Sequence, residues 1–390
     1  MSNDTQPEIR FPGFTEAWKQ RKLGEVSKIG DIDHRMPPSV DDGIPYLMTG
    51  DFIEENELNF ENTKLVSEDD YLQLSKKIRP EYGDILFARY ASVGAVRYVS
   101  THRKFLISYS CAIIKPFSDI DGHFLYPTLK TQKMQQKIEF EINPNSQKNI
   151  GIDSLKKLPL FIPKMDEQQK IGTFFKQLDD TIALHQRKLD LLKETKKGFL
   201  QKMFPKNGAK VPEIRFPGFT ENWEEKKFKE VINSGIKGKA KAEMSGTKSL
   251  YLDTNYLNGG VVTYVDSPRD VENDDVLILW DGSQAGTVYY GFSGALGSTL
   301  KAYRAKESGA FLYQQLKRNQ QIIYDRYRTP NIPHVVKTFT DEFMVSMPSS
   351  EEQNKIGAFF KQLDDTIALH QRKLDLLKET KKGFLQKMFV

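Results

Sequence analysis

Histidine and cysteine side chains often carry catalysis and metal binding, and their spacing in this chain supports neither. The six histidines are scattered, with no pair at a metal-ligand spacing: His34, His102, His123, His185, His334 and His370. The single Cys111 lies in the strand-like run FLISYSCAIIKP, which is typical of a buried, unreactive thiol. Neither phosphate-binding glycine motif occurs (G-x-x-x-x-G-K-S/T or G-x-G-x-x-G), nor does C-x-x-C or H-E-x-x-H. We therefore expect neither an active site nor a metal site in this chain.

Two internal repeats set the organisation of the chain. Residues 167–204 recur at 352–389 and differ only at Gln169/Asn354 and Thr173/Ala358. A shorter segment, PEIRFPGFTEAW at 7–18, recurs as PEIRFPGFTENW at 212–223. The chain is therefore an internal duplication of one unit. Each copy has a lead segment (7–18 or 212–223), a variable body (the first body, 19–163, or the second body, 224–351) and a near-identical long segment.

The two bodies differ in sequence but share a short skeleton. GDILFARYASVGAVRYV at 83–99 parallels DDVLILWDGSQAGTVYYG at 274–291. Each stretch has an acidic residue, an apolar strand, a turn of small residues ending in Gly94 or Gly286, and a second strand. The pattern predicts a hairpin at the same place in both bodies.

The long repeated segment has the periodicity of a helix with one apolar seam. Its apolar residues alternate at spacings of four and three, the heptad pattern of a coiled coil. The seam is predicted at Ile171, Phe175, Leu178, Ile182, Leu189, Leu192 and Phe199, and at Ile356, Phe360, Leu363, Ile367, Leu374, Leu377 and Phe384. Each helix is the natural partner of the other, and a duplicated unit closes most simply with its helices antiparallel.

Four polar residues interrupt the seam, and the helix starts also carry signals. His185, Lys196, His370 and Lys381 are expected to mark the register, because burying them against the wrong neighbour is costly. The alternative is that these positions are loosely packed and partly solvated. Capping boxes are expected at Asp166 with Gln169 and at Ser350 with Gln353.

Length and composition predict a soluble protein of two or three domains. The net charge is +5, but the first body has 20 basic and 20 acidic residues and the second body has 16 of each. The positive excess therefore lies in the repeated long segments. The start of the chain has no signal-peptide pattern and no apolar run reaches 18 residues, so we expect a cytoplasmic protein without membrane contact.

We expect an α+β fold with two globular domains separated by two long antiparallel helices in a coiled coil, related by an internal pseudo-two-fold. The boundaries follow the repeats: a first domain at 1–163, a first helix at 164–204, a second domain at 205–350 and a second helix at 351–390. A helix of 38 residues is roughly 57 Å long, enough to hold two domains well apart.

The combination of these features resembles one family. Two diverged bodies each precede a near-identical helix opening Glu-Gln-x-Lys-Ile, and the chain contains GDILFARYASVG and QKNIGIDSLKKLPLFIPKMDEQQKIG at 147–172. Over nearly its whole length the chain resembles the specificity subunit of type I restriction-modification systems.

The resemblance implies a non-catalytic role in DNA recognition. Each body would be a target-recognition domain reading one half of a bipartite site in double-stranded DNA. The helices would set the spacing and dock methyltransferase (modification) subunits, of which two are expected, alongside restriction/translocase subunits. No cofactor is expected in this chain, because S-adenosylmethionine, ATP and Mg would be held by these partner subunits.

Polar and aromatic residues in turn-like positions beside the shared strands are the candidates for base-edge or phosphate contacts. They are Arg89, Tyr90, Ser92, Arg97, Gln147, Lys148 and Asn149 in the first body, and Trp280, Asp281, Ser283, Gln284, Arg326, Arg328, Asn331 and His334 in the second. Any of them could instead cap a turn or pair with a carboxylate, and Trp280 could belong to the core. Because RTPNIPHVVKTF at 328–339 stands where the first body has NPNSQKNIGIDSL, we expect the second body to build its loop differently.

Two other classes of function stay open from the sequence. One is a coiled-coil scaffold or adaptor without direct DNA contact, which the neutral bodies favour. The other is a self-contained enzyme with an unrecognised site.

Overall fold

The computed structural model describes residues 6–53, 57–143, 148–206 and 208–390. It divides into two compact units, one of residues 1–186 and 372–390 and one of residues 187–371. Each unit combines one body with a part of each long helix, so the units cut across the four segments expected from the repeats. Among the described residues, no helix combines the length and the apolar character needed to cross a bilayer.

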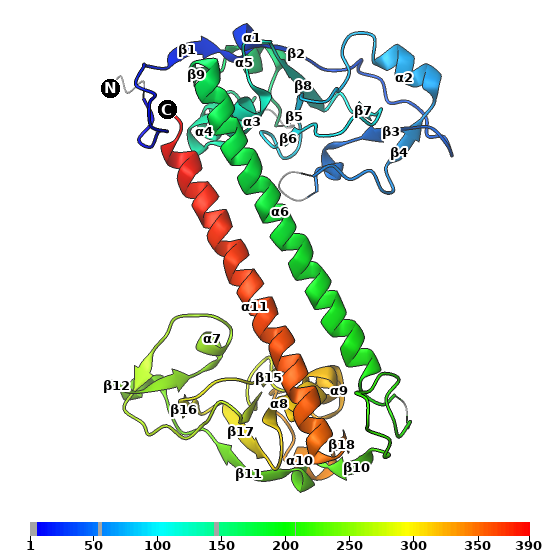
Figure 1. The fold of residues 1–390 in the computed structure, drawn as a ribbon, viewed down its shortest axis with the longest axis vertical. Coiled ribbons are helices and arrows are strands. Elements are labelled where there is room, and N and C mark those ends of the chain that lie inside the picture. The colour runs from blue at the N-terminus through cyan, green and yellow to red at the C-terminus, as the bar shows by residue number, and fades with distance from the viewer. Residues whose placement is uncertain (1–5, 54–56, 144–147, 207) are drawn as a thin grey trace. The chain divides into compact units, whose positions relative to one another are not determined.

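The first body is built on three small sheets (Figure 1). Strand β1 (Lys19–Lys22) pairs antiparallel with β9 (Pro159–Ile162). The central sheet has the order β2-β8-β5-β6, all antiparallel: β2 (Ser27–Gly30), β8 (Cys111–Pro116), β5 (Ile85–Ala88) and β6 (Val96–Tyr98). The third sheet holds β4 (Lys64–Val66), β3 (Ile44–Leu47) and β7 (Leu106–Ile107), with β3 and β7 parallel. The helices are α1 (Leu23–Val26), the 3-10 helix Thr49–Asp51, α2 (Glu68–Leu74), α3 (Gly122–Lys130), α4 (Gln132–Phe140) and α5 (Ile152–Lys157).

The second body repeats this strand order (Figure 1). Strand β10 (Glu224–Lys227) pairs with β18 (Met344–Met347). The central sheet is β11 (Ile232–Lys237), β17 (Leu300–Ala305), β14 (Val276–Leu279) and β15 (Val288–Tyr289). The third is β13 (Tyr264–Val265), β12 (Ser245–Leu252) and β16 (Ala295–Leu296), again with one parallel pair. The helices are α7 (Thr254–Leu257), α8 (Gly309–Arg318), α9 (Gln320–Arg326) and α10 (Phe339–Glu342), with 3-10 turns at Phe228–Glu230 and Ala242–Met244. The common topology confirms the expected internal repeat.

The hairpin predicted from the shared skeleton forms in both bodies. Strands β5 and β14 are buried along their whole length, so they read as continuous apolar runs. The turns close through the N–H of Gly94 to the carbonyl of Ala88 (3.0 Å) and the N–H of Gly286 to the carbonyl of Leu279 (2.7 Å). Both glycines have positive φ, 93° and 97°, a conformation that other residues rarely adopt.

The acidic residue before each central strand has the same structural role. Asp84 accepts the backbone N–H of Glu81 at 2.7 Å and pairs with Lys115 at 2.5 Å. Asp275 accepts the backbone N–H of Glu272 at 2.9 Å and forms a bidentate pair with Arg304, both contacts 2.9 Å. These carboxylates hold the turn that leads into the strand, and they tie it to the neighbouring strand β8 or β17.

The two long helices, α6 (Met165–Lys202) and α11 (Ser350–Lys387), are antiparallel. In the first unit Phe174 near the start of α6 lies 5.0 Å from Phe384 near the end of α11, measured between ring centroids. In the second unit Phe199 near the end of α6 lies 5.1 Å from Phe359 near the start of α11. All fourteen predicted apolar seam residues are buried or half-buried.

The seam lysines are ion-paired across the helices. Lys381 Nζ lies 2.7 Å from Asp179, and its side chain is only 4% exposed. Lys196 Nζ lies 2.5 Å from Asp364, at the equivalent place in the second unit. His370 is buried and His185 half-buried. The partly solvated alternative therefore does not hold for Lys381, whereas Lys196 is paired but keeps a side chain that is 16% exposed.

The helix starts differ from the capping boxes expected from the sequence. Asp166 lies inside α6, which already begins at Met165. At α11 the cap is one residue earlier than expected, because Ser349 Oγ accepts the N–H of Glu352 at 3.4 Å. The side-chain amides of Gln168 and Gln353 bond back to the carbonyls of Pro163 and Pro348, each at 3.0 Å.

Each lead segment joins the start of one helix to the end of the other. Arg10 makes a bidentate pair with the buried Glu167 of α6 (2.6 and 2.7 Å), and the N–H of Ile9 donates to the carbonyl of Lys387 of α11 (2.9 Å). In the second unit the same joint is made by Arg215 with Glu352 (both 2.7 Å) and by Ile214 N–H with the carbonyl of Lys202 (2.9 Å).

The residues after each helix complete the core of the body beside that end. In the first unit one buried cluster combines Trp18, Phe124, Ile171, Phe175, Met388 and Phe389. In the second unit the equivalent residues Trp223, Phe311, Ile356, Phe360, Met203 and Phe204 share one core. Each body thus depends on the end of the other copy's helix for part of its apolar packing.

Candidate nucleic-acid interface

Both bodies hold the same backbone frame at the end of the central strand. The N–H of Arg89 donates to the carbonyl of Ser110 (2.9 Å), and the Arg89 carbonyl accepts the N–H of Ile150 (3.1 Å). We call this arrangement the strand-end frame. In the second body it is formed by Trp280 with the carbonyl of Thr299 (2.8 Å) and the N–H of Val335 (2.9 Å).

The loop of the second body is anchored to the frame as in the first. Residues 144–147 of the first-body loop lie outside the described residues, so the expectation that the rest of the loop is built differently stays a prediction. An antiparallel bridge joins Tyr90 to Asn149 in the first body, and another joins Asp281 to His334 in the second. Backbone pairing does not depend on side-chain identity, which is why the difference in sequence did not reveal it. The frame is common to both bodies, and the side chains it carries have diverged.

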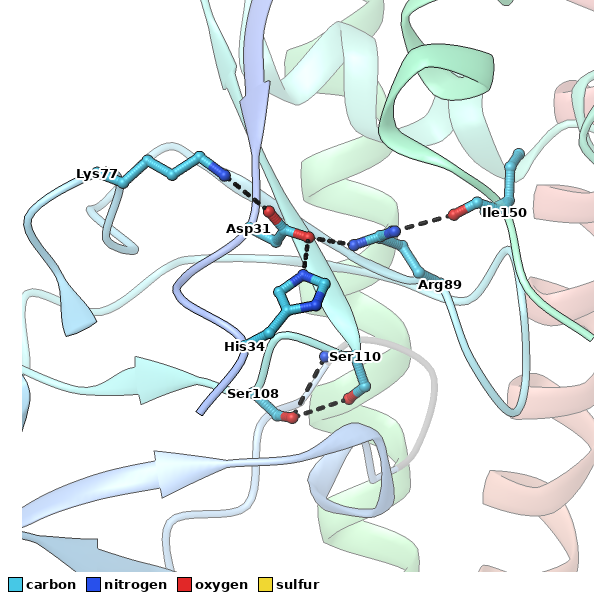
Figure 2. Close-up of polar contacts among 7 residues, drawn as sticks. All are labelled: Asp31, His34, Lys77, Arg89, Ser108, Ser110 and Ile150. Carbon is cyan, nitrogen blue, oxygen red and sulfur yellow. Dashed lines mark hydrogen bonds and ion pairs between the residues drawn. The ribbon is translucent and has the colours of Figure 1, made fainter. Parts of the chain in front are cut away.

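Arg89 is buried in the strand-end frame of the first body (Figure 2). Its Nε donates to the carbonyl of Ile150 (3.0 Å), and its Nη1 pairs with the carboxylate of Asp31 at the end of β2. Asp31 also accepts from Lys77 Nζ (3.1 Å) and lies 3.0 Å from His34 Nε2. The Arg89 guanidinium is therefore used in contacts within the protein, and it ties the frame to β2.

The Asp31 carboxylate stays ionised at this site. Burial alone would raise the pKa of Asp31, but hydrogen bonds from His34 and Lys77 and the charge of Arg89 outweigh it and lower that pKa. The carboxylate thus carries a full negative charge with which to orient its partners.

The second body makes a similar tether with its charges reversed, but its partner lies one residue further from the end of β14 than Arg89 lies from the end of β5. Asp31 follows Gly30, and Lys237 stands at the matching position after Ile236 in the β11–β17 register. Lys237 Nζ lies 3.0 Å from Asp281 Oδ2. The pair joins the same two strand ends, but its side chains are 54% and 41% exposed. The bodies therefore share a mechanical link and present opposite charges beside it.

The remaining first-body candidates divide into buried and exposed residues. Arg97 is buried, with Nε and Nη2 donating to the carbonyls of Glu57 and Phe52, each at 3.2 Å. Tyr90 and Asn149 are half-buried in the frame. The exposed candidates are Ser92 and Lys148, and Gln147 lies outside the described residues.

Trp280 of the second body is a core residue with one occupied face. Its side chain is 5% exposed, packs edge-on against Phe339, and carries Lys301 Nζ 3.3 Å from its ring centroid. Half-buried candidates are Asp281, Arg328 and His334, of which Arg328 donates to the carbonyl of Ser283 (3.1 Å). Exposed candidates are Ser283, Gln284, Arg326 and Asn331. The exposed polar candidates thus come from the turn, the loop and the last residue of α9 rather than from the strand.

One exposed group beside the frame was missed in the sequence. The His34 side chain is 59% exposed, and its ring stacks on Tyr109 with centroids 4.9 Å apart. The carboxylate of Asp31 holds Nε2, which orients the ring and leaves Nδ1 on its other side. The net charge of each body, considered alone in the sequence, also did not reveal three lysines at and after the end of β11, Lys237, Lys239 and Lys241.

Comparison with known proteins agrees with this two-fold architecture. The family model described as the type I restriction modification DNA specificity domain matches residues 15–194 and 220–379. The chain is similar to the type I restriction enzyme MjaVIII specificity subunit of Methanocaldococcus jannaschii, 30% identical over 47% of this chain and 44% of that relative. It is also similar to the putative type I restriction enzyme MjaX specificity subunit of the same organism, 23% identical over 79% of this chain and 78% of that protein.

A solved structure shares the fold. The S subunit of a type I restriction-modification system from M. genitalium superposes with a TM-score of 0.74 at 18% identity, covering 99% of both chains. With two matched segments that together span most of its length, the chain belongs to the family of type I restriction modification DNA specificity domains and carries two copies of that domain.

Proposed function

We propose that this chain is the DNA sequence-recognition subunit of a type I restriction-modification complex, with each body reading one half of a bipartite target. The observation that carries the proposal is the strand-end frame, which is built identically in two bodies whose exposed side chains differ. A reader needs a constant backbone to place its side chains and variable side chains to distinguish bases. The exposed turn and loop residues on each frame are the candidates for base contacts.

The repeated helices support the assignment of protein partners. Two nearly identical helices offer the same surface twice, which suits two copies of one methyltransferase subunit, and restriction/translocase subunits would join them. S-adenosylmethionine, ATP and Mg would be bound by those partners. The chain itself would act as a non-catalytic subunit in the cytoplasm.

A coiled-coil scaffold without DNA contact is the second candidate, favoured by the neutral charge of each body. The two bodies keep the same backbone frame, but their side chains differ and the charges of the ion pair beside the frame are reversed. A scaffold without DNA contact would not require this combination. The recognition function accounts for both observations.

Methylome sequencing of cells with and without this gene tests the proposal. We expect one bipartite methylated motif that depends on the gene. Replacing residues 19–163 with the first body of a relative should change one half of the motif and leave the other half intact. Loss of dependence on the gene, or a change in both halves, would contradict the assignment of one body to each half-site.

A further inference from the structure

A row of three exposed lysines starts at the last residue of strand β11 in the second body and continues beyond it. The segment 237–241, Lys-Gly-Lys-Ala-Lys, leads from β11 toward β12 (Figure 1). Lys237, Lys239 and Lys241 are exposed, whereas Gly238 and Ala240 are buried. The row interrupts a body whose overall charge is zero.

The backbone holds this alternation in place. The N–H of Gly238 donates to the carbonyl of Leu300 (2.9 Å), and the N–H of Ala240 to the carbonyl of Leu296 (3.0 Å). A Cβ at Gly238 would lie 2.0 Å from the carbonyl oxygen of Gly297, so no larger residue fits there. Ala240 is only 1% exposed. Since the small residues must face inward, the lysines must all face solvent.

The row is continuous with the strand-end frame. Lys237 Nζ lies 3.0 Å from Asp281 of the frame, and Lys301 lies over the neighbouring Trp280 ring. The pKa of Lys301 is lowered by burial and further by the charges of Lys237 and Lys337, against the opposing effect of Asp281. Several ammonium groups therefore gather where a nucleic acid read by the frame would lie.

Lys239 and Lys241 can bind an external anion, although the charge of Lys239 also acts on Asp270, where it opposes the rise in pKa that burial causes. Among the described residues, neither of them makes an ion pair within 4.0 Å, unlike Lys237. Alternate residues of an extended segment are about 6.6 Å apart, which is close to the separation of consecutive phosphates along one DNA strand. Lysine is well suited to phosphate because it acts as a point charge.

We propose that Lys239 and Lys241 bind consecutive phosphates of one DNA strand beside the half-site of the second body, while Lys237, held by Asp281, aligns the row with the frame. This inference rests on the proposed function. It adds the backbone contacts that position the second body, as distinct from those that read bases. The equivalent positions of the first body begin with Asp31 and Asp33, so this row belongs to the second body alone.

The test compares Lys239→Ala/Lys241→Ala with wild type in the complex with the methyltransferase partner. Binding is measured from 50 to 200 mM salt on a duplex carrying the wild-type methylated motif and on one of equal length with the second half-site scrambled. The slope of log K against log salt should become shallower by about 1.8, or 0.9 per phosphate contact, with affinity at 0.1 M salt lower on the order of 50-fold. The loss should be equal on both duplexes, and the methylated motif should not change.

The control is Lys227→Ala/Lys229→Ala, which removes the same charge before β11 instead of after it. These residues are separated from Lys239 and Lys241 by the six-residue strand, about 20 Å. The control should keep the wild-type slope. Lys239→Arg/Lys241→Arg should also keep it, and Lys241→Ala alone should show half the change.

Several outcomes would overturn the proposal. An unchanged slope in Lys239→Ala/Lys241→Ala would exclude phosphate contacts, and an equal change in the control would reduce the effect to net charge. Relaxed base preference in the second half-site would make these lysines base readers, and loss of the methyltransferase from the complex would make the row a protein-docking surface. A wild-type complex that directs no gene-dependent bipartite methylation would instead contradict the proposed function itself.

Discussion

At the scale of residues, the ion pair that joins two strand ends is buried in one body and exposed to solvent in the other. In the first body the Asp31–Arg89 pair is buried, with side chains 6% and 7% exposed, and in the second the Lys237–Asp281 pair is largely exposed. A buried pair is costly to break from one side because the remaining charge loses its partner, whereas an exposed pair contributes little. The two tethers should therefore respond differently to the same kind of substitution.

Arg89→Met should lower the free energy of unfolding of the first body by up to about 3 kcal/mol, because Asp31 loses its buried partner and keeps only Lys77 and His34. Asp31→Asn/Arg89→Met should recover part of that loss. The matched change Lys237→Met in the second body should cost less than about 1 kcal/mol. Urea unfolding of the three variants measures these differences, and equal losses in both bodies would contradict this account.

The same carboxylate predicts a dependence of stability on pH. The pKa of Asp31 is lowered in the folded chain, so the unfolded chain binds its proton more readily as the medium becomes acidic. Its contribution is present above the unfolded pKa, about 3.9, and is lost as the pH falls through the lower folded value. Asp31→Asn should flatten the acid limb of the stability curve below about pH 4, measured by urea unfolding against pH. A wild-type limb in the variant would count against this assignment.

At the scale of elements, two equivalent ion pairs set the register of the helix pair. Lys196 pairs with Asp364, and Lys381 with Asp179, so each helix supplies one lysine and one aspartate. The carbon chains of these residues fill seam positions while their charged ends meet across the helices. A slip of either helix would separate both pairs at once, and the register is therefore strongly favoured.

A fragment of residues 1–204 should form a symmetric dimer. Its seam would lack α11, and a second copy offers the same helix with Lys196 opposite Asp179 of that copy. Its Met203 and Phe204 would replace Met388 and Phe389 in the aromatic cluster around Trp18. Sedimentation at micromolar concentration should show a dimer, which with the methyltransferase should modify a palindrome of the first half-site.

Charge exchange tests whether the register pairs hold this dimer together. Lys196→Asp alone should weaken the dimer by placing two carboxylates together, and Asp179→Lys/Lys196→Asp should restore it by exchanging both partners. A monomeric wild-type fragment would rule out the dimer, and a double variant as weak as the single one would show that the pairs do not set the register.

At the scale of the whole molecule, each lead segment makes the same contact with the end of a long helix. Ile9 bonds to the end of α11 as Ile214 bonds to the end of α6. Seven residues, 205–211, connect Phe204 to the second lead segment. Joining residue 390 directly to residue 1 would place seven residues, Val390 and residues 1–6, between Phe389 and the first lead segment. The break in the chain could therefore stand at either junction.

A circular permutant that begins at Lys210 and ends at Lys206, with residue 390 fused to residue 1, should fold and direct the wild-type methylated motif. The contacts of both lead segments are kept, so its thermal unfolding temperature should lie close to that of the wild type. A permutant opened within α6, between Asp190 and Leu191, serves as the control and should fail. Loss of the motif in the first permutant would show that the order of the chain matters beyond these contacts.

The sequence by itself determined the features that depend on local pattern. The duplication, the heptad seam through Ile171 and Leu189, and the hairpins ending at Gly94 and Gly286 follow from periodicity and turn chemistry, which act over a few residues. The antiparallel direction followed from the symmetry that a duplicated unit favours.

Tertiary structure alone decided which polar side chains face solvent at the candidate interface. From the sequence alone Arg89 is a candidate exposed cation, and only the pairing of distant strands places Asp31 beside it. No local sequence signal predicts the pair of reversed charge between Lys237 and Asp281. The lysine row was not predicted from the sequence, because the net charge of a whole body does not show where charges cluster. The exposure of each lysine depends instead on which residues pack beneath it. Long-range strand register brings residues tens of positions apart together, and no short stretch of sequence contains that information.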